Sequence, residues 1–480
     1  MTDITSMPTS NTNSRTLIWF RSDLRVEDNT ALQAAAAFGN PVVACFVITP
    51  EQWREHDMSP IKARFIYENL ICLQQSLLDK CIPLKIITVA TFDLLPKTLL
   101  SLCQSCEVTQ LFANHEYGVN EKQRDYQCER LLSDSGIGCH FFHDQTVMAP
   151  GAVTKSDSTP YKVFTPFSKQ WRKLTHWPPG VAANIKPQVM PAIKPDKIDK
   201  QLFNLGPHPA IAWQAGEEAA HKKLQAFATQ AMGDYRQHRD LPALEGTSSL
   251  SPYLAIGVLS PRQCLKVAYD SLQGANPLAE EGIQCWINEI IWRDFYIHIL
   301  DFFPHVSRHQ AFKIKTENLP WRYDEKDFQR WCSGQTGIPI IDAAMRQLVE
   351  TGWMHNRLRM VTAMFLSKNL FIDWRWGERF FMQHLIDGFL ASNNGGWQWS
   401  ASTGTDSVPY FRVFNPTTQG QRFDTEGEFI RRFVPEIQHL NNKEIHEPPL
   451  DLFSSASYPS PMVDLSLSRK SAIQHFKSLE

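Results

Sequence analysis

The 480-residue chain lacks the features that mark exported and membrane proteins. Residues Met1 to Ser14 are polar, with neither the basic start nor the apolar core of a signal peptide. No stretch approaches the roughly 20 apolar residues that span a bilayer. The ten cysteines are scattered, and the lone C-x-x-C pair, Cys103 and Cys106, has no second pair at metal-binding spacing. We expect a cytoplasmic protein without a membrane segment, whose cysteines stay reduced and pack in the core.

Strong charge of either sign and several enzyme motifs are also missing. The formal net charge is −2, so any nucleic-acid site must come from a local basic patch. There is no H-E-x-x-H, no Walker loop and no G-x-S-x-G elbow, and the histidines are isolated. We therefore expect neither a metal site nor hydrolytic chemistry.

Residues 15–145 alternate short apolar, β-branched runs with amphipathic stretches. This alternation predicts an α/β domain with a parallel, Rossmann-like sheet, whose ligands bind at the carboxyl ends of the strands. No G-x-G-x-x-G follows the first strand, so an ordinary dinucleotide site is not expected there. The expected strands are Leu17–Phe20, Val42–Ile48, Leu84–Val89, Val108–Phe112 and Cys139–Phe142, and the expected helices are Asn29–Phe38, Pro60–Lys80, Leu94–Cys106 and Glu121–Asp134.

The pattern changes twice after residue 145. Ten of the thirty prolines fall within residues 146–212, which predicts an extended interdomain linker. Residues 213–480 show a helical pattern with few strand signals, so we expect an all-helical second domain. Gly233 and Gly352 follow helix-like runs and indicate turns or caps. Nine of the fourteen tryptophans lie between Trp286 and Trp399, which makes this domain the place to look for a site.

The segment CWINEIIWRDFYIHIL combines charges with large aromatic side chains. On a helix, Glu289, Trp292, Arg293 and Tyr296 share one face, because they are spaced i, i+3, i+4 and i+7. An ordinary core helix carries its ion pairs at the edge of the apolar stripe, whereas these charges lie inside it. This placement favours a functional face.

The segment TGWMHNRLRM repeats this mixture on a second expected helix. One face would combine an indole, an amide, a cation and a thioether, namely Trp353, Asn356, Arg357 and Met360. From residue 351 to residue 370 the only formal charges are cationic, namely Arg357, Arg359 and Lys368. An acid-free basic face beside aromatic rings is typical of a nucleic-acid site, and a solvated basic face is an equally good interpretation.

Two further segments suggest cofactor binding. Thr247, Ser248, Ser249 and Ser251 cluster just before an expected helix, where hydroxyls suit a phosphate, although plain helix capping is the commoner use. In LIDGFLASNNGGWQWSASTGTD, adjacent glycines weaken a helix and indicate that something approaches the backbone closely. Asp387 in this segment could pair with a basic group or accept a ring N–H. The residues alone therefore predict an aromatic-rich helical pocket for a phosphate-bearing cofactor, beside a basic face.

These segments make the chain resemble the class I cyclobutane pyrimidine dimer photolyases of the photolyase/cryptochrome family. The resemblance runs from LIWFRSDLRVEDNTAL through MSP at residues 58–60, YKVFTPFSKQW and EGTSSLSPYLAIGVLSPRQC to GEFIRRFVPE. Its most specific parts are WINEIIWRDFY, TGWMHNRLRM and NNGGWQWSASTGTD.

The resemblance implies reduced FAD, held in a folded form by the helical domain. Asn393 would lie near the flavin N5, and Arg359 would pair with Asp387 beside the ring. The implied FAD shell is Tyr235, Thr247, Ser248, Ser249, Leu250, Ser251, Trp286, Arg293, Asn356, Arg359, Asp387, Gly388, Phe389 and Asn393. Phe389 stands where the family usually carries an acid, and Ser249 where relatives often carry a basic residue.

The implied activity is light-driven repair of pyrimidine dimers in DNA by electron transfer from the excited flavin. Glu289 would be protonated in a dry site and would hydrogen-bond a thymine carbonyl. Base-flipping enzymes, photolyases among them, extrude the target from the duplex, and Trp292 and Trp399 would flank the flipped dimer. The implied DNA-binding residues are Arg239, Glu289, Trp292, Arg293, Asn356, Arg357, Met360 and Trp399.

The resemblance also implies two accessory systems. Trp397, Trp374 and Trp321 match an electron-hopping chain that reduces the oxidised flavin under light. Asn120 and Glu121 match positions that bind a methenyltetrahydrofolate antenna, together with Arg308, where close relatives have lysine. Ser307 replaces a cysteine of those relatives.

Three other functions remain alternatives. Cryptochromes share the fold but usually lose the repair residues and often add a long tail, whereas this chain keeps Glu289, Trp292, Asn356, Met360 and Trp399 and has a short tail. Photolyases for the (6-4) lesion tend to carry a histidine pair where this chain has His355–Asn356. A flavin-dependent electron carrier would need no DNA partner, and its basic face would be accidental. The resemblance favours a monomeric photolyase that binds damaged DNA and splits its cyclobutane pyrimidine dimers.

Overall fold

The computed structural model describes residues 14–177, 180–206, 208, 210, 213–449 and 458–479. The expectation about a signal peptide falls on residues 1–13, outside this part, as do four linker prolines and the domain boundary at residue 212. Within the described part, no helix has the length and apolar character needed to cross a membrane.

The N-terminal unit is built on one parallel sheet of five strands, in the order β3-β2-β1-β4-β5. All five expected strands are present, within about two residues at each end. Their bounds are β1 Arg15–Phe20, β2 Val42–Ile48, β3 Leu84–Thr88, β4 Val108–Asn114 and β5 Gly138–Phe142. The chain order reverses between β1 and β4, so a crevice is expected above their carboxyl ends.

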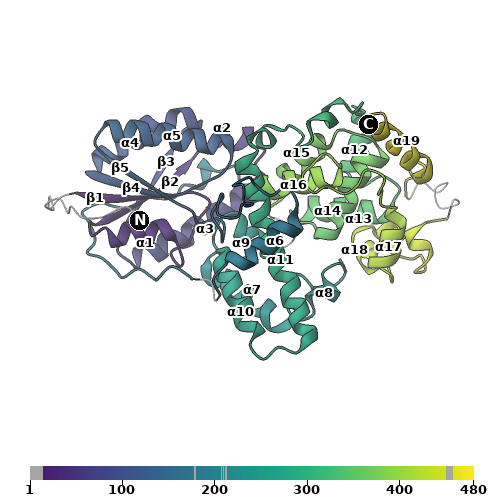
Figure 1. The fold of residues 1–480 in the computed structure, drawn as a ribbon, viewed down its shortest axis with the longest axis horizontal. Coiled ribbons are helices and arrows are strands. Elements are labelled where there is room, and N and C mark those ends of the chain that lie inside the picture. The colour runs from purple at the N-terminus through teal and green to yellow at the C-terminus, as the bar shows by residue number, and fades with distance from the viewer. Residues whose placement is uncertain are drawn as a thin grey trace.

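Helices cover both faces of this sheet (Figure 1). On one face Ile18 and Phe20 of β1 pack towards α1 and α3, and on the other Leu17 and Trp19 pack towards α4 and α5. This alternation buries both faces of the strand. The helices are α1 Thr30–Ala37, α2 Pro50–Glu55, α3 Pro60–Leu78, α4 Leu95–Ser105, which follows the short 3₁₀ turn η1 Phe92–Leu94, and α5 Val119–Asp134. Cys103 and Cys106 are free and buried in this core, as expected.

The linker is not wholly extended, contrary to the prediction from its prolines. It contains α6 Phe164–Leu174 and the 3₁₀ turn η2 Lys200–Leu202. Pro166 does not prevent α6, because it lies in the first turn, where a backbone N–H has no partner within the helix. Trp171 of α6 is buried, and its indole donates to Asp294 at 2.9 Å, which ties the linker to the second unit.

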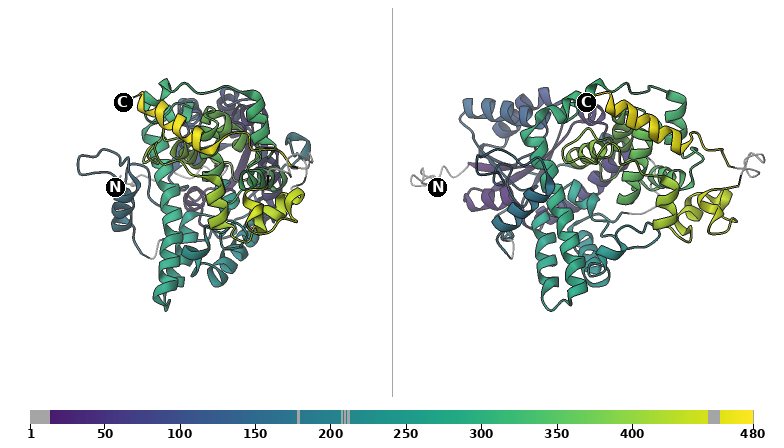
Figure 2. Two further views of the ribbon diagram at one scale, coloured as in Figure 1. Left: turned by 90° about the vertical axis from the view of Figure 1, so that its right-hand side faces the viewer. Right: turned by 45° about the vertical axis from the view of Figure 1, so that its right-hand side comes forward.

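The C-terminal unit is helical, which confirms the predicted fold class. Its longest helix, α11, packs against α10, and the two project together from the molecule (teal in Figure 2). The helices are α7 Glu217–Gln230, α8 Tyr235–His238, α9 Ser251–Ala255, α10 Pro261–Leu272, α11 Pro277–Phe302, α12 Glu325–Cys332, α13 Pro339–Thr351, α14 Asn356–Met364, α15 Trp374–His384, α16 Leu390–Ser400, α17 Pro416–Phe423, α18 Glu428–Phe433 and α19 Leu465–Lys477. Short turns complete it: the 3₁₀ helices η3 Pro304–Arg308, η4 Ile314–Asn318, η6 Pro435–Ile437 and η7 Glu444–His446, and the π-helical turn η5 Phe365–Asn369.

The helical face expected for the segment TGWMHNRLRM is wrong at its N-terminal end. Gly352 ends α13 in the left-handed region at φ +70°, as expected for a C-cap. The chain then turns, and α14 begins only at Asn356, with His355 Nδ1 accepting from the backbone N–H of Arg357 at 3.2 Å. Trp353 therefore lies in the turn and does not share a helix with Asn356 and Arg357.

A buried cluster of two arginines and two aspartates joins the two units. Arg262 of α10 contacts Asp144 at 2.7 Å and Asp28 at 3.0 Å, and Arg25 pairs with Asp144 from the sheet side. Asp144 and Asp28 are 0% and 2% exposed. Burial alone would raise the pKa of Asp144, but the charges of Arg25 and Arg262 outweigh it and hold that pKa well below its usual range.

Candidate functional site

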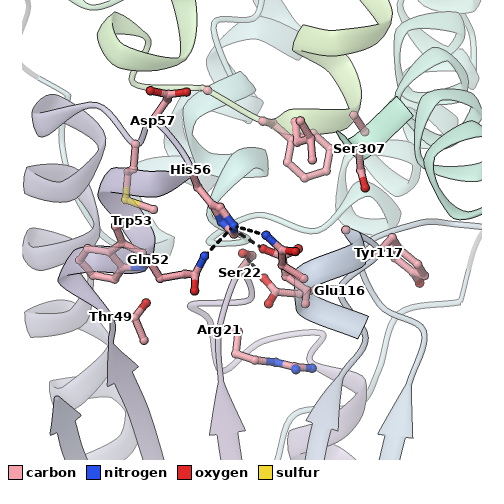
Figure 3. Close-up of a pocket in the computed structure, with 18 of the residues that line it drawn as sticks. Arg21, Ser22, Thr49, Gln52, Trp53, His56, Asp57, Glu116, Tyr117 and Ser307 are labelled. Atoms are coloured by element: carbon pink, nitrogen blue, oxygen red, sulfur yellow. Dashed lines mark hydrogen bonds and ion pairs between the residues drawn. The ribbon is translucent and has the colours of Figure 1, made fainter. Parts of the chain in front are cut away.

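A cavity of about 430 Å³ lies at the carboxyl ends of the strands, between the sheet and the helical unit (Figure 3). Arg21 and Thr49 directly follow β1 and β2, and Glu116 follows β4. Ser307 and Phe389 contribute to the opposite wall from the helical unit. The cavity therefore stands where the strand order predicts a ligand.

His56 links two of the predicted antenna residues inside this cavity. Its Nε2 lies 2.9 Å from the amide nitrogen of Asn120 and 3.0 Å from that of Gln52, so it faces two donors. Its Nδ1 lies 3.4 Å from Glu121 and is placed to donate to that carboxylate. Burial raises the pKa of Glu121 against the opposing charge of His56. Arg308, the third predicted antenna residue, lines the same cavity with its side chain exposed.

Acid is expected to remove the stabilisation contributed by Glu116. Its carboxylate accepts from Ser22 Oγ at 2.5 Å and from Arg124 Nη2 at 2.9 Å. Burial would raise its pKa, but Arg124 and Arg21 lower it from 4.5 to about 2. A lowered pKa stabilises the folded state above the ordinary value, and that contribution is lost as the pH falls towards the folded-state pKa.

Urea unfolding of wild type and Glu116→Gln tests this expectation. We expect wild type to exceed the variant by up to about 3 kcal/mol at neutral pH, and by about half as much or less near pH 3. A difference that stays constant between the two pH values would mean that Glu116 does not titrate as its surroundings suggest.

Glu289 and Arg239 form an ion pair where α8 meets α11. Arg239 Nη1 donates to Glu289 Oε1 at 2.5 Å, and both side chains are about one-quarter exposed, 24% and 28%. The buried rings of Tyr235 and Trp286 border this pair and pack on Phe227, with centroids at 5.9 Å and 5.3 Å. Burial raises the pKa of Glu289 and outweighs the charge of Arg239. In this structure the carboxyl is paired with Arg239, so its protonation in the site stays a prediction.

The expected acid-free basic face on α14 is wrong. Arg357 donates to Asp240 at 2.7 Å and 3.2 Å, and Arg359 donates to Asp387 at 2.8 Å. Lys368 is 0% exposed in the π-helical turn after α14, where its ammonium donates to a backbone carbonyl at 3.2 Å. The chain fold brings acids from distant segments and buries one cation, which a local count of charges does not reveal.

Trp292 stacks on Phe164 of the linker helix α6. The ring centroids lie 3.6 Å apart with planes at 4°, and Tyr296 lies 5.5 Å away on the same helix face. A Cβ on Gly395 of α16 would come within 2.3 Å of the Tyr296 ring, so glycine there permits the close approach that the sequence suggested. Gly396 faces open space. Met360 and Trp399 are half-buried on α14 and α16, two helices in contact.

The hydroxyl-rich segment from Thr247 to Ser251 does not serve as a helix cap. Helix α9 begins after Leu250 without a side-chain cap. In the part of the chain that the structure describes, the side-chain hydroxyls of Thr247, Ser248, Ser249 and Ser251 make no hydrogen bond, and Ser249 has φ +48°. Asp387 accepts from Arg359 through Oδ2, while its buried Oδ1 has no partner among the described residues. Free hydroxyls and a buried, unpaired acceptor fit a phosphate-bearing cofactor with a ring donor.

Arg293 faces the cofactor-shell residues and not the DNA-binding group of Arg239 and Arg357. It donates to the backbone carbonyls of Gln145 and, at 3.4 Å, of Leu254, and lies 5.1 Å from the ring centroid of Phe389. This placement favours its predicted FAD role over its predicted DNA contact. Phe389 is the N-cap of α16 and cannot cap it, whereas an acid would.

Asn393 is anchored through one end of its amide. Its Nδ2 donates to the backbone carbonyl of Glu378 at 3.0 Å, and its oxygen has no partner among the residues described. Asn356 is exposed at the start of α14. The two amides therefore keep hydrogen-bonding capacity for a ligand.

Trp321, Trp374 and Trp397 are buried in one apolar cluster of the helical unit. A Cβ on Gly377 of α15 would come within 2.1 Å of the Trp397 ring, so this glycine lets the ring lie against the helix that begins with Trp374. Their electron-transfer roles remain predictions.

Sequence reasoning missed three residues that shape the site: Phe164, Asp240 and Lys62. Lys62 reaches from α3 to the backbone carbonyl of Gly388 at 2.6 Å, and burial lowers its pKa to about 8. Asp240 directly follows Arg239 in the sequence, which is a usable signal. Phe164 and Lys62 carry no such signal, because their contacts depend on how the two units dock.

Comparisons with known proteins identify the family of the chain. The family model for DNA photolyase matches residues 16–188, and that for the FAD binding domain of DNA photolyase matches residues 286–478. A Vibrio cholerae protein named deoxyribodipyrimidine photo-lyase is 45% identical, over 96% of this chain and 99% of that protein.

Two solved structures share the fold over nearly all of both chains. A class III photolyase from Agrobacterium tumefaciens has a TM-score of 0.87 at 32% identity, covering 100% of this chain and 99% of that one. A Synechocystis cryptochrome has a TM-score of 0.86 at 27% identity, covering 97% and 100%. The predicted family, fold class and FAD-binding unit are confirmed, and the chain belongs to the DNA photolyase family.

Proposed function

We propose that this enzyme is a deoxyribodipyrimidine photo-lyase, which uses light and reduced FAD to split cyclobutane pyrimidine dimers in DNA. The observation that carries this proposal is the arrangement on helix α11, which presents Trp286, Glu289 and Trp292 within two helical turns. Glu289 is paired with Arg239. The 45% identical relative bears the same name, whereas the cryptochrome is 27% identical, which favours repair over signalling.

The cofactor would be held by the free hydroxyls before α9, by Asp387 and by the amides of Asn356 and Asn393. Reduced FAD, when bound, supplies a photoexcitable one-electron donor. Arg359 fixes Asp387 Oδ2, so that Oδ1 stays directed at its ligand. Trp286 and Tyr235 exclude water from this side of the site, because both are buried.

The chain's own residues would then receive the lesion. Trp292 keeps a fixed orientation through Phe164 and, together with Trp399, would flank the flipped dimer, while Met360 would fill the space beside it. Arg239 and Arg357 would exchange their carboxylate partners for DNA phosphates. Until DNA binds, these ion pairs keep both arginine side chains in place at the entrance of the lesion site. When Arg239 leaves, Glu289 loses a neighbouring positive charge, which favours its protonated, donating form.

A blue-light repair assay tests the proposed function. Purified enzyme containing FAD should restore DNA that carries cyclobutane dimers in the light and leave it unchanged in the dark. Repair of only the (6-4) lesion would favour the alternative photolyase, and absence of repair with FAD bound would favour a cryptochrome or a flavin-dependent electron carrier.

Glu289→Gln should lower the yield of repair per absorbed photon and leave FAD bound. Gln keeps a donor for a thymine carbonyl but cannot provide the acidic proton, so we expect a several-fold loss and not abolition. Bound FAD, measured by absorbance, is the control. An unchanged photon yield would remove Glu289 from the reaction.

Further expectations complete the proposal. We propose methenyltetrahydrofolate as the occupant of the cavity around His56, because Asn120, Glu121 and Arg308 gather there. We also propose an antenna-binding α/β domain of residues 15–145, a linker of residues 146–212 and a FAD- and DNA-binding domain of residues 213–480, in a monomer that works in the cytoplasm. Extraction of the chromophores followed by absorbance spectroscopy tests the antenna, since folate and flavin absorb differently.

A further inference from the structure

A continuous run of aromatic rings leads from buried Trp397 to exposed Tyr323. Trp397 lies 6.0 Å from Trp331, Trp331 5.8 Å from Phe328, Phe328 5.1 Å from Trp376, and Trp376 5.8 Å from Tyr323, all between ring centroids. We name these five residues the aromatic branch. Trp331 and Phe328 come from α12 and Trp376 from α15, and Tyr323 precedes α12. The branch shares only Trp397 with the predicted chain through Trp374 and Trp321.

The surroundings of Trp331 favour loss of an electron there. Its indole N–H donates to the backbone carbonyl of Thr362 at 3.3 Å, which stabilises a positive charge on the ring. In the part of the chain described, the indole N–H groups of Trp374 and Trp397 have no acceptor. The guanidinium of Arg375 lies 4.8 Å from the Trp374 ring, but it is paired with Asp373 and Glu317, so its charge is compensated. The hydrogen bond of its indole therefore favours oxidation of Trp331 over oxidation of Trp374.

Burial decreases along the aromatic branch towards its far end. Trp331 is 0% exposed, Phe328 and Trp376 are partly buried, and Tyr323 is 67% exposed. The Tyr323 hydroxyl donates to Asp373 Oδ2 at 3.3 Å. A tyrosine that loses an electron becomes strongly acidic and must release its phenolic proton, and Asp373 is placed to accept it. Solvent then gives soluble reductants access to the ring.

We propose that the aromatic branch is a second route by which light-driven oxidation leaves Trp397 and ends as a radical on Tyr323. The inference rests on the proposed function, because it needs the FAD that this function requires; when that FAD is in its oxidised form, its photoexcited state is the one-electron oxidant that acts on Trp397. Trp397 gives up one electron, Trp331 refills Trp397, Trp376 refills Trp331 across the Phe328 ring, and Tyr323 refills Trp376. Tyr323 has then lost one electron, and its proton moves to Asp373. A soluble thiol that donates one hydrogen atom restores Tyr323 and becomes a thiyl radical, and Asp373 releases the displaced proton to solvent. One electron has then moved from the thiol to the flavin.

The test is light-dependent trapping of the Tyr323 radical in the holoenzyme. The enzyme with oxidised FAD is illuminated without added reductant, in the presence of a nitroso spin trap, and adducts are located by peptide mass spectrometry. We expect an adduct on Tyr323 in wild type and in Trp321→Phe, which leaves the branch intact. The adduct should fall to the level of the dark sample in Trp376→Phe, Trp331→Phe and Tyr323→Phe. Bleaching of oxidised flavin in the same samples reports whether Trp397 still delivers its electron.

The outcomes separate the branch from the proposed function. Flavin bleaching without a Tyr323 adduct in wild type overturns the branch and leaves repair untouched. An adduct that persists in Trp376→Phe means that Tyr323 is oxidised by another path and also overturns it. The paramagnetic signal of a tyrosyl radical, lost in Tyr323→Phe and kept in Trp321→Phe, is the independent support. Because Tyr323 is exposed, its replacement by Phe is not expected to disturb folding.

Discussion

Asp144→Ala is expected to lower the free energy of unfolding by about 3–5 kcal/mol, because it leaves two buried guanidinium groups short of a partner. Asp144 is 0% exposed and accepts from Arg25, Arg262 and the Thr30 hydroxyl, the last at 2.8 Å. Arg262 belongs to the helical unit, and Arg25 lies in the loop after β1 of the N-terminal unit, so the change also weakens the docking of the two units. Urea unfolding followed by circular dichroism should show a lower midpoint, or a transition divided in two as the units separate.

Two companion variants make the Asp144 result specific. Asp270→Ala removes a carboxylate from the exposed pair with Lys266, at 2.6 Å, and should change stability little. Asp144→Asn keeps the shape of the side chain and part of its hydrogen bonding. It provides the measurement if the alanine variant does not fold. Should both Asp144 variants unfold like wild type, the buried cluster would not be what joins the units.

The sheet domain could be predicted from sequence because its signals are local. Each apolar, β-branched run from Val42–Ile48 onward is long enough for one strand and is bounded by turn residues, so pattern and structure coincide. The prolines of the linker gave a wrong prediction at α6, because a proline in the first turn of a helix looks the same in sequence as one that breaks a helix. The helix α2 was missed because its six residues are too few to show a helical period.

The residues of the candidate site could be predicted from the sequence, but the ion pairs and ring contacts between them could not. The spacing on α11 correctly brings Glu289 and Trp292 to one region, since that relation lies within one helix. The pair of Arg357 and Asp240 joins positions 117 residues apart, and that of Arg239 and Glu289 joins positions 50 apart. Such pairs depend on helix packing, which no local spacing encodes. The same is true of Phe164, whose stacking on Trp292 follows from how the linker folds back.

Trp292→Ala is expected to weaken binding of DNA that contains a cyclobutane dimer by about tenfold to a hundredfold. Stacking of a base on an aromatic ring typically contributes about 1–3 kcal/mol, which corresponds to about fivefold to 150-fold in the dissociation constant and includes this range. Phe164 holds the Trp292 ring parallel at 3.6 Å, so the ring needs little ordering when the lesion arrives. Fluorescence anisotropy with labelled duplexes, with and without one dimer, provides the measurement. The affinity for undamaged DNA should hardly change, because phosphate contacts dominate it.

Two comparisons distinguish stacking from a general loss of the DNA surface. Trp292→Ala should leave the dependence of affinity on salt unchanged, whereas Arg357→Ala should reduce that slope by about one phosphate contact. Trp292→Phe, which can still stack on Phe164, should recover most of the affinity for damaged DNA. If Trp292→Ala binds the dimer as tightly as wild type, this ring does not face the lesion. If it reduces binding of damaged and undamaged DNA equally, the ring supports the surface and does not read the dimer.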